Sequence, residues 1–395
     1  MVHSQQVQVG IIGAGPAGLM LGWLLARAGV SFVIVERQTR HYVEARIRAG
    51  VLEQGAVDLL TNHGLGERVL REGLIHDGIE LACDGARLRV DFQALTGKAV
   101  TVYGQTEITR DLNQAHASIG SHIVYQASNV QLSSLDTARP QLHCTHGGEA
   151  QVFSCEFIVG CDGFHGVSRT AITNLHEFER SYPVGWLGVL CDTPPVAEEL
   201  IYASHARGFA LCSMRSPTRS RYYLQVGLDE NLADWPDERF WHELRARLPT
   251  PIAAQLVSGP ALEKSIAPLR SYVAAPMQYG RLFLAGDAAH IVPPTGAKGL
   301  NLALADVAAL APAIVKQIKT NDGAALTSYS ETRLKHIWKA ERFSWWFTSI
   351  THRLSEDDFS RQLQRAEFDY LVSSRAAQTA LAENYVGQWG DKQGV

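Results

Sequence analysis

A glycine-rich loop near the N-terminus constrains the fold of this chain more than any other feature. The pattern G-x-G-x-x-G, formed by Gly13, Gly15 and Gly18, follows an apolar run at residues 7–12. A helical pattern at residues 17–28 comes next. Gly13 permits a tight turn, Gly15 lets a phosphate approach the backbone, and Gly18 lets the helix pack closely on the strand. Because a helix N-terminus also offers free N–H groups to anions, we expect a parallel βαβ unit that binds a pyrophosphate.

A carboxylate supports the same interpretation. Glu36 ends a second apolar run at residues 31–35 and comes 18 residues after Gly18. A carboxylate at this place accepts a hydrogen bond from a ribose hydroxyl and repels a 2′-phosphate. The alternative is a purely structural glycine turn, which this strand-loop-helix context disfavours.

A second segment, about 270 residues later, selects the nucleotide. Gly286 and Asp287 follow an apolar run at residues 281–285, and residues 293–299 lead towards another helix. Asp287 suits a hydrogen bond to a ribityl hydroxyl, although an ordinary helix cap is the alternative. The helix N-terminus can stabilise negative charge on a reduced flavin ring. A ligand that contacts both segments must be long, so the sequence favours FAD over NAD.

A third segment, residues 160–169, follows an apolar run at residues 157–159 and includes Asp162. The chain holds a single G-x-G-x-x-G pattern, so a nicotinamide donor must dock in a surface groove if FAD occupies the loop. Each candidate for that groove can equally form an ordinary surface ion pair. The candidates are Arg37, Gln38, Tyr42, Arg46, His165, Arg169 and Arg270.

Composition excludes several classes of protein. Hydrophobic residues make up 46% and charged residues 19% of 395 positions, which permits a large core, and a net charge of −4 gives no field that favours nucleic acid or an anionic membrane. The six cysteines form no C-x-x-C pair, so we expect reduced thiols in the cytoplasm and no metal site. Residues 15–35 are apolar, but a βαβ unit explains them better than a membrane span.

The chain as a whole is expected to be α/β (α+β overall), with a Rossmann-like FAD-binding domain and an interleaved antiparallel β-sheet domain for the substrate. The FAD-binding domain is expected to be discontinuous and to comprise residues 1–75, 100–183 and 270–320. Residues 76–99 and 184–269 form the expected substrate domain, and residues 321–395 a C-terminal helical region. Pro312 lies within a helical pattern, and we expect a kink or break there.

In their order, the three segments resemble those of the flavoprotein aromatic hydroxylases. The resemblance covers nearly the whole chain and is strongest at residues 46–55, 103–107, 208–213, 293–301 and 382–387. It implies hydroxylation of 4-hydroxybenzoate to 3,4-dihydroxybenzoate, with FAD bound and NADPH and O2 as co-substrates, through a flavin C4a-hydroperoxide. Two alternatives remain open: a hydroxylase of a related phenolic acid, and a non-catalytic FAD-fold binding protein.

The resemblance also implies roles on the substrate side. Ser213, Arg215 and Tyr223 would bind the substrate carboxylate, and a guanidinium suits this because it pairs with a carboxylate through two parallel hydrogen bonds. A proton relay would start at the substrate phenol. The residues expected along it and around the ring are Tyr202, Tyr385, His76, Met214 and the Pro294 carbonyl. Without the resemblance, each tyrosine would be read as a core residue and the histidine as structural.

On the flavin side, the resemblance places Glu36 at the adenosine ribose, Arg48 at the pyrophosphate and Arg221 near the flavin ring. The family has serine where this chain has Ala17, which removes one side-chain contact to phosphate. The full set of expected cofactor-binding residues comprises Gly13, Gly15, Ala17, Gly18, Glu36, Arg46, Ile47, Arg48, Ala49, Gly50, Val51, Gln105, Asp162, Arg221, Asp287, Gly299, Leu300 and Asn301. The resemblance further implies a homodimer, for which residues 345–347 are candidate contacts, although they can equally be core.

Overall fold

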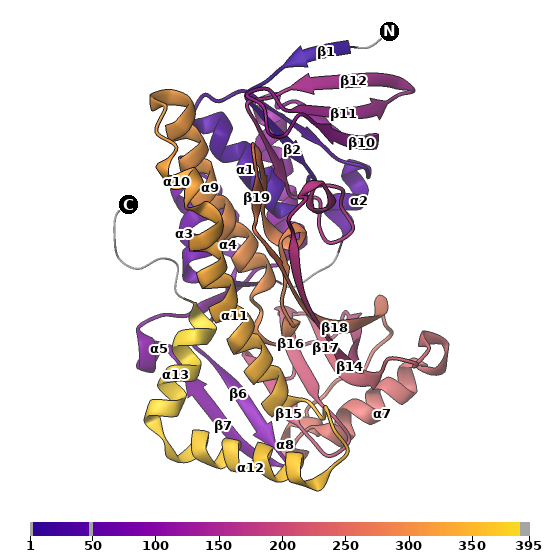
Figure 1. Cartoon of the computed structure of the whole chain (residues 1–395). Coiled ribbons are helices and arrows are strands. Elements are labelled where there is room, and N and C mark those ends of the chain that lie inside the picture. The colour runs from indigo at the N-terminus through magenta and orange to yellow at the C-terminus, as the bar shows by residue number, and fades with distance from the viewer. Residues whose placement is uncertain (1–2, 47–49, 388–395) are drawn as a thin grey trace.

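The computed structural model describes residues 3–46 and 50–387, and Figure 1 shows their arrangement. A parallel sheet with its helices occupies the upper part of the view, and an antiparallel sheet with the C-terminal helices occupies the lower part. Ile47, Arg48 and Ala49, which we expect to contact the cofactor, lie outside the described residues.

The upper part is built on a six-stranded sheet whose neighbours are parallel except for the first pair. Its strands lie in the order β19 (Gln278–Tyr279), β20 (Leu282–Leu284), β13 (Phe157–Gly160), β2 (Val9–Ile12), β3 (Phe32–Val35) and β9 (Ile123–Val124). The strands β2 and β13 are buried at every residue, as expected for a parallel sheet covered on both faces. Helix α1 (Pro16–Arg27) packs against α6 (Gln105–Ser118) and α9 (Gly299–Thr320). The predicted βαβ unit is therefore present.

The lower part is built on an eight-stranded sheet, antiparallel except for the parallel pair β15 and β6. Its order is β21 (His290–Ile291), β18 (Glu263–Ala275), β14 (His176–Cys191), β17 (Arg219–Gly227), β16 (Ala210–Ser216), β15 (Leu200–Ser204), β6 (Gly78–Cys83) and β7 (Ala86–Asp91). The edge strand β21 follows the Gly286–Ala288 turn directly, so the chain passes from the end of β20 in the parallel sheet into the antiparallel one.

Two small sheets complete the strands. One has the order β1 (His3–Gln6), β12 (Glu149–Ser154), β11 (Gln141–His146) and β10 (Ser128–Ser133), and the other β4 (Val51–Glu53), β8 (Val100–Val102) and β5 (Leu74–His76). The sequence did not predict β1, because its residues are polar. As the edge strand of its sheet it pairs in parallel with β12, so backbone hydrogen bonds and not apolar burial hold it.

The remaining helices surround the sheets, and Figure 1 shows the C-terminal ones beside β6 and β7. They are α2 (Arg40–Ala45), α3 (Gln54–Asn62), α4 (Gly66–Glu72), α5 (Phe92–Thr96), α7 (Asp237–Arg247), α8 (Thr250–Ala253), α10 (Ala324–Thr327), α11 (Tyr329–Thr351), α12 (Asp358–Ser373) and α13 (Arg375–Val386).

The expected break at Pro312 is wrong, because α9 continues through it. Pro312 lies on the exposed side of the helix, where water can hydrogen-bond the carbonyl group that the proline leaves without a partner. The buried side of α9, which includes Leu310 and Ile314, stays packed in the core. Among the described helices, α9 is the one long and apolar enough to cross a membrane, but most of it is buried within the protein.

Candidate active site

The three segments singled out in the sequence meet at one edge of the parallel sheet. Gly160 at the end of β13 lies between Ile12 at the end of β2 and Leu284 at the end of β20. Each segment follows the carboxyl end of its strand, and ligands of parallel sheets bind at such an edge. Two segments that lie about 270 residues apart in the sequence therefore face the same site.

The glycine loop has the geometry that a phosphate requires. Gly13 has a φ of +102°, and a Cβ there would lie 2.4 Å from the carbonyl oxygen of Cys161. A Cβ on Gly18 would lie 1.9 Å from the carbonyl oxygen of Gly13. A Cβ on Gly15, in contrast, would meet open space, and no side chain of the described residues caps the start of α1. The N–H groups of this helix end therefore remain available to an anion.

Glu36 lies beside this loop, at the end of β3. Its carboxylate accepts hydrogen bonds from the backbone N–H groups of Ala14 and Gln38, each at 2.8 Å. These two contacts orient the side chain, and the carboxylate keeps further lone pairs for a ribose hydroxyl.

The Gly286–Ala288 turn presents a single acidic side chain. Gly286 has a φ of +65°, and a Cβ there would lie 3.2 Å from Cβ of Ala303 in α9 and 3.6 Å from Cβ of Ala17 in α1. Asp287 is exposed, whereas its neighbours on both sides are buried. The turn therefore lies between the two helices and offers one carboxylate to a ligand.

The start of α9 forms a second uncapped helix end. Within the part of the chain that the structure describes, no side chain caps it, its first turn holds no acidic residue, and a Cβ on Gly299 would meet open space. Asn301, in that turn, donates to the carbonyl oxygen of Val51 and accepts from the N–H of Glu53, both at 2.9 Å. Leu300 beside it is buried. Two free helix ends on either side of one carboxylate fit the phosphate, ribityl and ring portions of FAD.

Asp162 and Gln105 are two further residues expected on the cofactor side. Asp162 accepts from the N–H and the hydroxyl of Ser168, both at 2.9 Å, and its other oxygen is buried without a hydrogen-bond partner among the described residues. Burial raises the pKa of Asp162. Gln105 is the first residue of α6, next to Gly104. A Cβ on Gly50 would lie 2.8 Å from Cα of Gly104 and 2.9 Å from Nη1 of Arg215, so this region also reaches the substrate sheet.

Two buried tyrosines lie in contact at the predicted start of the proton relay. The hydroxyl oxygens of Tyr202 in β15 and Tyr385 in α13 are 2.6 Å apart. Only 2% and 1% of their respective surfaces are exposed. Burial raises the pKa of both phenols, so both stay protonated at neutral pH. A pair of neutral hydroxyls at this distance can pass a proton along.

His76 lies in the neighbouring small sheet, at the end of β5. The carbonyl oxygen of Asp77, the next residue, accepts from the N–H of Phe92 at 2.6 Å, and the Phe92 ring stacks on Tyr385 at 4.9 Å. His76 is buried, and neither of its ring nitrogens has a partner among the described residues. Burial lowers its pKa, although Glu199 and Asp77 oppose this, so the ring is neutral at pH 7 and able to accept a proton.

The expected carboxylate anchors lie on adjacent strands. Ser213 and Arg215 belong to β16, and Tyr223 lies opposite Leu211 of the same strand, on β17. Nε of Arg215 is buried without a hydrogen-bond partner among the described residues, and burial lowers the pKa of its guanidinium, while Tyr223 opposes the shift. Met214, between Ser213 and Arg215, is partly exposed. A buried donor without a partner costs free energy, so this position favours a ligand with an acidic group.

Arg221 and the carbonyl group of Pro294 each interact with another group of the protein. Arg221 is 5% exposed, contacts Glu263 at 3.2 Å and lies over the Tyr223 ring at 5.3 Å. A Cβ on Gly188 would approach the ring of Tyr223 to 2.9 Å, so glycine makes room for that tyrosine. The Pro294 carbonyl accepts from the N–H of Ala297 at 2.9 Å and retains one lone pair for a substrate.

The candidates for the nicotinamide groove form two groups. Arg169 and Arg270 lie over the ring of Phe164, at 4.5 and 4.3 Å, and Phe164 packs edge-on against His165. The other group lies at the end of β3 and near α2, where Tyr42 is 50% exposed. Its other members are Arg37, Gln38 and Arg46, of which the two arginines are exposed.

Sequence reasoning missed three buried contacts near these residues. Nζ of Lys298 lies 2.5 Å from Glu53, Trp186 donates to His352 at 2.6 Å, and Asp306 contacts the Gly286–Ala288 turn. The partners are far apart in the sequence, so neither periodicity nor spacing could indicate them. The clearest signal was the presence of charged residues within apolar helical patterns, as with Asp306.

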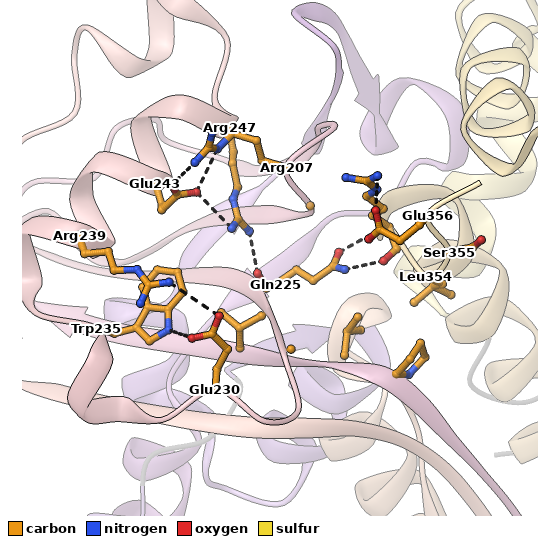
Figure 2. A pocket seen from close by; sticks show the side chains of 16 residues that line it. Arg207, Gln225, Glu230, Trp235, Arg239, Glu243, Arg247, Leu354, Ser355 and Glu356 are labelled. Atoms are coloured by element: carbon orange, nitrogen blue, oxygen red, sulfur yellow. Dashed lines mark hydrogen bonds and ion pairs between the residues drawn. The ribbon is translucent and has the colours of Figure 1, made fainter. Parts of the chain in front are cut away.

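A hollow of a different kind lies away from these residues. It has a volume of about 570 Å³ and is lined by residues of β14, β17, α7 and the 353–356 loop, none of them an expected site residue. Figure 2 shows that its charges pair within the wall: Glu243 contacts Arg207 and Arg247, and Glu230 contacts Trp235 and Arg239. No ligand is assigned to it.

Comparisons with known proteins show the family of this chain. The FAD binding domain family matches residues 6–344. A p-hydroxybenzoate hydroxylase of Acinetobacter baylyi is 52% identical over 390 residues, which cover 98% of this chain and 96% of the relative. A 3-(3-hydroxy-phenyl)propionate/3-hydroxycinnamic acid hydroxylase of Escherichia coli is 25% identical, covering 84% of this chain and 60% of the relative.

Solved structures show the same fold. The crystal structure of a p-nitrophenol 4-monooxygenase from Pseudomonas putida has a TM-score of 0.81 at 18% identity and covers 97% of this chain and 99% of the other. PqsL, a probable FAD-dependent monooxygenase from Pseudomonas aeruginosa, has a TM-score of 0.77 at 22% identity, with coverages of 92% and 100%. Given the family match and the near end-to-end relative, this chain belongs to the FAD-dependent aromatic monooxygenases, in the family that contains p-hydroxybenzoate hydroxylase.

Proposed function

We propose that this chain hydroxylates 4-hydroxybenzoate at the 3-position, forming 3,4-dihydroxybenzoate and water with NADPH and O2 as co-substrates. The observation that carries the proposal is the buried pair Tyr202 and Tyr385, whose hydroxyl oxygens are 2.6 Å apart. Such a pair suits a phenolic substrate because it can receive the phenol proton. The relative named p-hydroxybenzoate hydroxylase, at 52% identity, supports the same substrate.

The two ends of the substrate meet different side chains in this proposal. Arg215 pairs with the carboxylate, since its buried Nε has no hydrogen-bond partner among the described residues. Ser213 and Tyr223 add hydroxyl donors from the same face of the sheet. With the carboxylate held there, the phenol at the opposite end of the ring is directed to Tyr202.

The reaction needs a phenolate, because an ionised ring attacks an electrophilic oxygen more readily than a neutral one. A free phenol has a pKa near 10, so a base must help at neutral pH. Tyr202 accepts the phenol proton and donates its own to Tyr385, which passes its hydroxyl proton on to the neutral ring of His76. When bound, FAD supplies hydride acceptance and oxygen transfer. The buried walls around Tyr202 exclude bulk water.

NADPH is proposed to dock transiently on the exposed residues around β3 and α2, where Arg37 can meet its 2′-phosphate. We also propose a cytoplasmic homodimer. Of the three residues expected at its interface, Trp345 is 44% exposed and available for contact, whereas Phe347 is buried in the core.

Product identification tests the proposal. Purified enzyme is supplied with FAD, NADPH and 4-hydroxybenzoate, and the products are separated by chromatography while peroxide is measured. We expect 3,4-dihydroxybenzoate in proportion to the NADPH consumed. A parallel assay with 3-hydroxybenzoate and dihydroxybenzoates would show whether the enzyme hydroxylates a different phenolic acid. If no compound led to NADPH oxidation, the chain would be a non-catalytic FAD-binding protein.

A further inference from the structure

A buried carboxylate in α9 lies directly beneath the turn that carries Asp287. Asp306 is 0% exposed and accepts three hydrogen bonds. Its Oδ2 atom accepts from the N–H of Gly286 at 2.9 Å and from Nε2 of His290 at 2.6 Å, and its Oδ1 atom accepts from Nε of Arg333 at 2.8 Å. These contacts hold both ends of the segment from Gly286 to His290.

The three hydrogen-bond partners of Asp306 belong to different elements around the site. Gly286 begins the turn that follows β20 of the parallel sheet, His290 begins β21 at the edge of the antiparallel sheet, and Arg333 belongs to α11. Asp306 itself lies in α9, whose N-terminus is the uncapped helix end near the expected flavin ring. One side chain thus fixes the turn relative to both sheets and to that helix.

All three partners of Asp306 are donors, so a carboxylate is the side chain that suits this position. Burial raises the pKa of Asp306, but His290, Arg333 and the Gly286 N–H outweigh burial and lower the pKa below its ordinary value. Asparagine has nearly the same shape, yet its NH2 group would face one of the three donors and leave it unpaired. Substitution therefore disturbs hydrogen bonding without creating a cavity.

We propose that Asp306 is a positioning residue for the flavin, which acts through the Gly286–Ala288 turn to hold the carboxylate of Asp287 in place for the ribityl chain. The proposal rests on Asp287 being a cofactor ligand. It extends the cofactor site to a residue that makes no contact with the ligand itself.

The test measures the FAD dissociation constant of the apoprotein by the quenching of flavin fluorescence. Asp306→Asn is expected to raise this constant at least tenfold. Asp287→Ala is expected to raise it as well, and adding Asp306→Asn to Asp287→Ala is expected to change it by less than twofold. Non-additivity of this kind is expected if both residues act through one contact.

Tyr329→Phe is the matched control. The Tyr329 hydroxyl donates to the carbonyl oxygen of Leu284 at 2.8 Å in the same core, and among the described residues it forms no hydrogen bond with Gly286 or His290. This variant is expected to lower the melting temperature while changing the FAD dissociation constant by less than threefold. If Asp306→Asn does not fold, His290→Phe removes one donor from Asp306 and is expected to weaken FAD binding at least threefold, again without additivity to Asp287→Ala.

The outcomes separate the two assignments. If Asp287→Ala binds FAD like the wild type, Asp287 is not a ligand and the role of Asp306 falls with it. If Asp287→Ala weakens binding but Asp306→Asn changes it by less than twofold, or if the two effects multiply in the double variant, the positioning role alone is overturned.

Discussion

The two halves of this active site differ in whether backbone groups or side chains form them. At the edge of the parallel sheet, backbone groups dominate: the turn at Gly13, the open approach at Gly15 and the uncapped ends of α1 and α9. In the antiparallel sheet, side chains dominate, and residues such as Tyr202 and Tyr385 come from elements 183 positions apart.

The difference determines how each half can be damaged. A backbone site depends on the chain path, so a single added methyl group can disrupt it while most side-chain changes leave it intact. A side-chain site tolerates backbone variation but depends on single functional groups held in a dry environment. Substitutions in the two halves should therefore affect different measurements.

The largest effect is expected from Gly13→Ala. Its Cβ would lie 2.4 Å from the carbonyl oxygen of Cys161, and a φ of +102° strains any residue other than glycine. We expect FAD affinity to fall by about 100-fold or more, because strain of ~1–3 kcal/mol adds to the displacement of the loop. Flavin retention on gel filtration measures this. Full retention of flavin would show that the backbone of this loop is not essential.

Arg215→Ala should damage the other half alone. Loss of a charge-assisted pair worth about 1.5–3 kcal/mol raises the dissociation constant for 4-hydroxybenzoate at least tenfold. FAD affinity should stay unchanged. Titration of the flavin absorbance with substrate measures the effect, and Arg215→Lys provides a control that keeps the charge but loses the bidentate geometry. Unchanged substrate binding in the alanine variant would remove Arg215 from the substrate site.

Tyr385→Phe should leave both binding steps intact and slow the reaction. The variant removes the hydroxyl that lies 2.6 Å from Tyr202, so the phenol proton loses its exit. We expect hydroxylation at neutral pH to fall about tenfold, which is less than the ~100-fold or more that positioned proton transfer usually contributes. Product formed per NADPH oxidised measures it. Wild-type coupling in the variant would exclude the relay.

The same contrast explains how much the sequence could predict. The strand-loop-helix at Gly13 and the segment at Asp287 were predictable, because glycine spacing follows directly from local backbone geometry. The neighbouring ends of β2, β13 and β20 follow from parallel pairing. The hydrogen bonds of Asp306 were not predictable, because they depend on packing between distant helices. The short strand β1 was missed because edge pairing leaves no apolar periodicity.

The pH dependence of the wild-type hydroxylation rate should show where His76 gains a proton. Burial lowers its pKa below 6.5, so the ring is neutral above that pH and gains a proton only below it. We expect the rate of hydroxylation to be flat from pH 6.5 to 8 and to decline at lower pH. His76→Asn should lower the rate about fivefold at pH 7, with recovery towards pH 9 as hydroxide replaces the base. A wild-type rate that climbs steadily between pH 6.5 and 8 would contradict this sign.

The smallest effect is expected from Ala17→Ser, which adds a hydroxyl at the start of α1. Ala17 is 7% exposed and lies beside the Gly286–Ala288 turn, so a serine hydroxyl there can reach a phosphate oxygen. Because the free N–H groups of the helix end are expected to supply most of the phosphate binding, we expect FAD affinity to rise only twofold to threefold, consistent with a net hydrogen bond of about 0.5 kcal/mol. Ala17→Cys, of similar size but with only a weak S–H donor, is the matched control and should not strengthen binding. A gain of tenfold or more in the serine variant would mean that side chains contribute to the flavin half as strongly as they do to the substrate half.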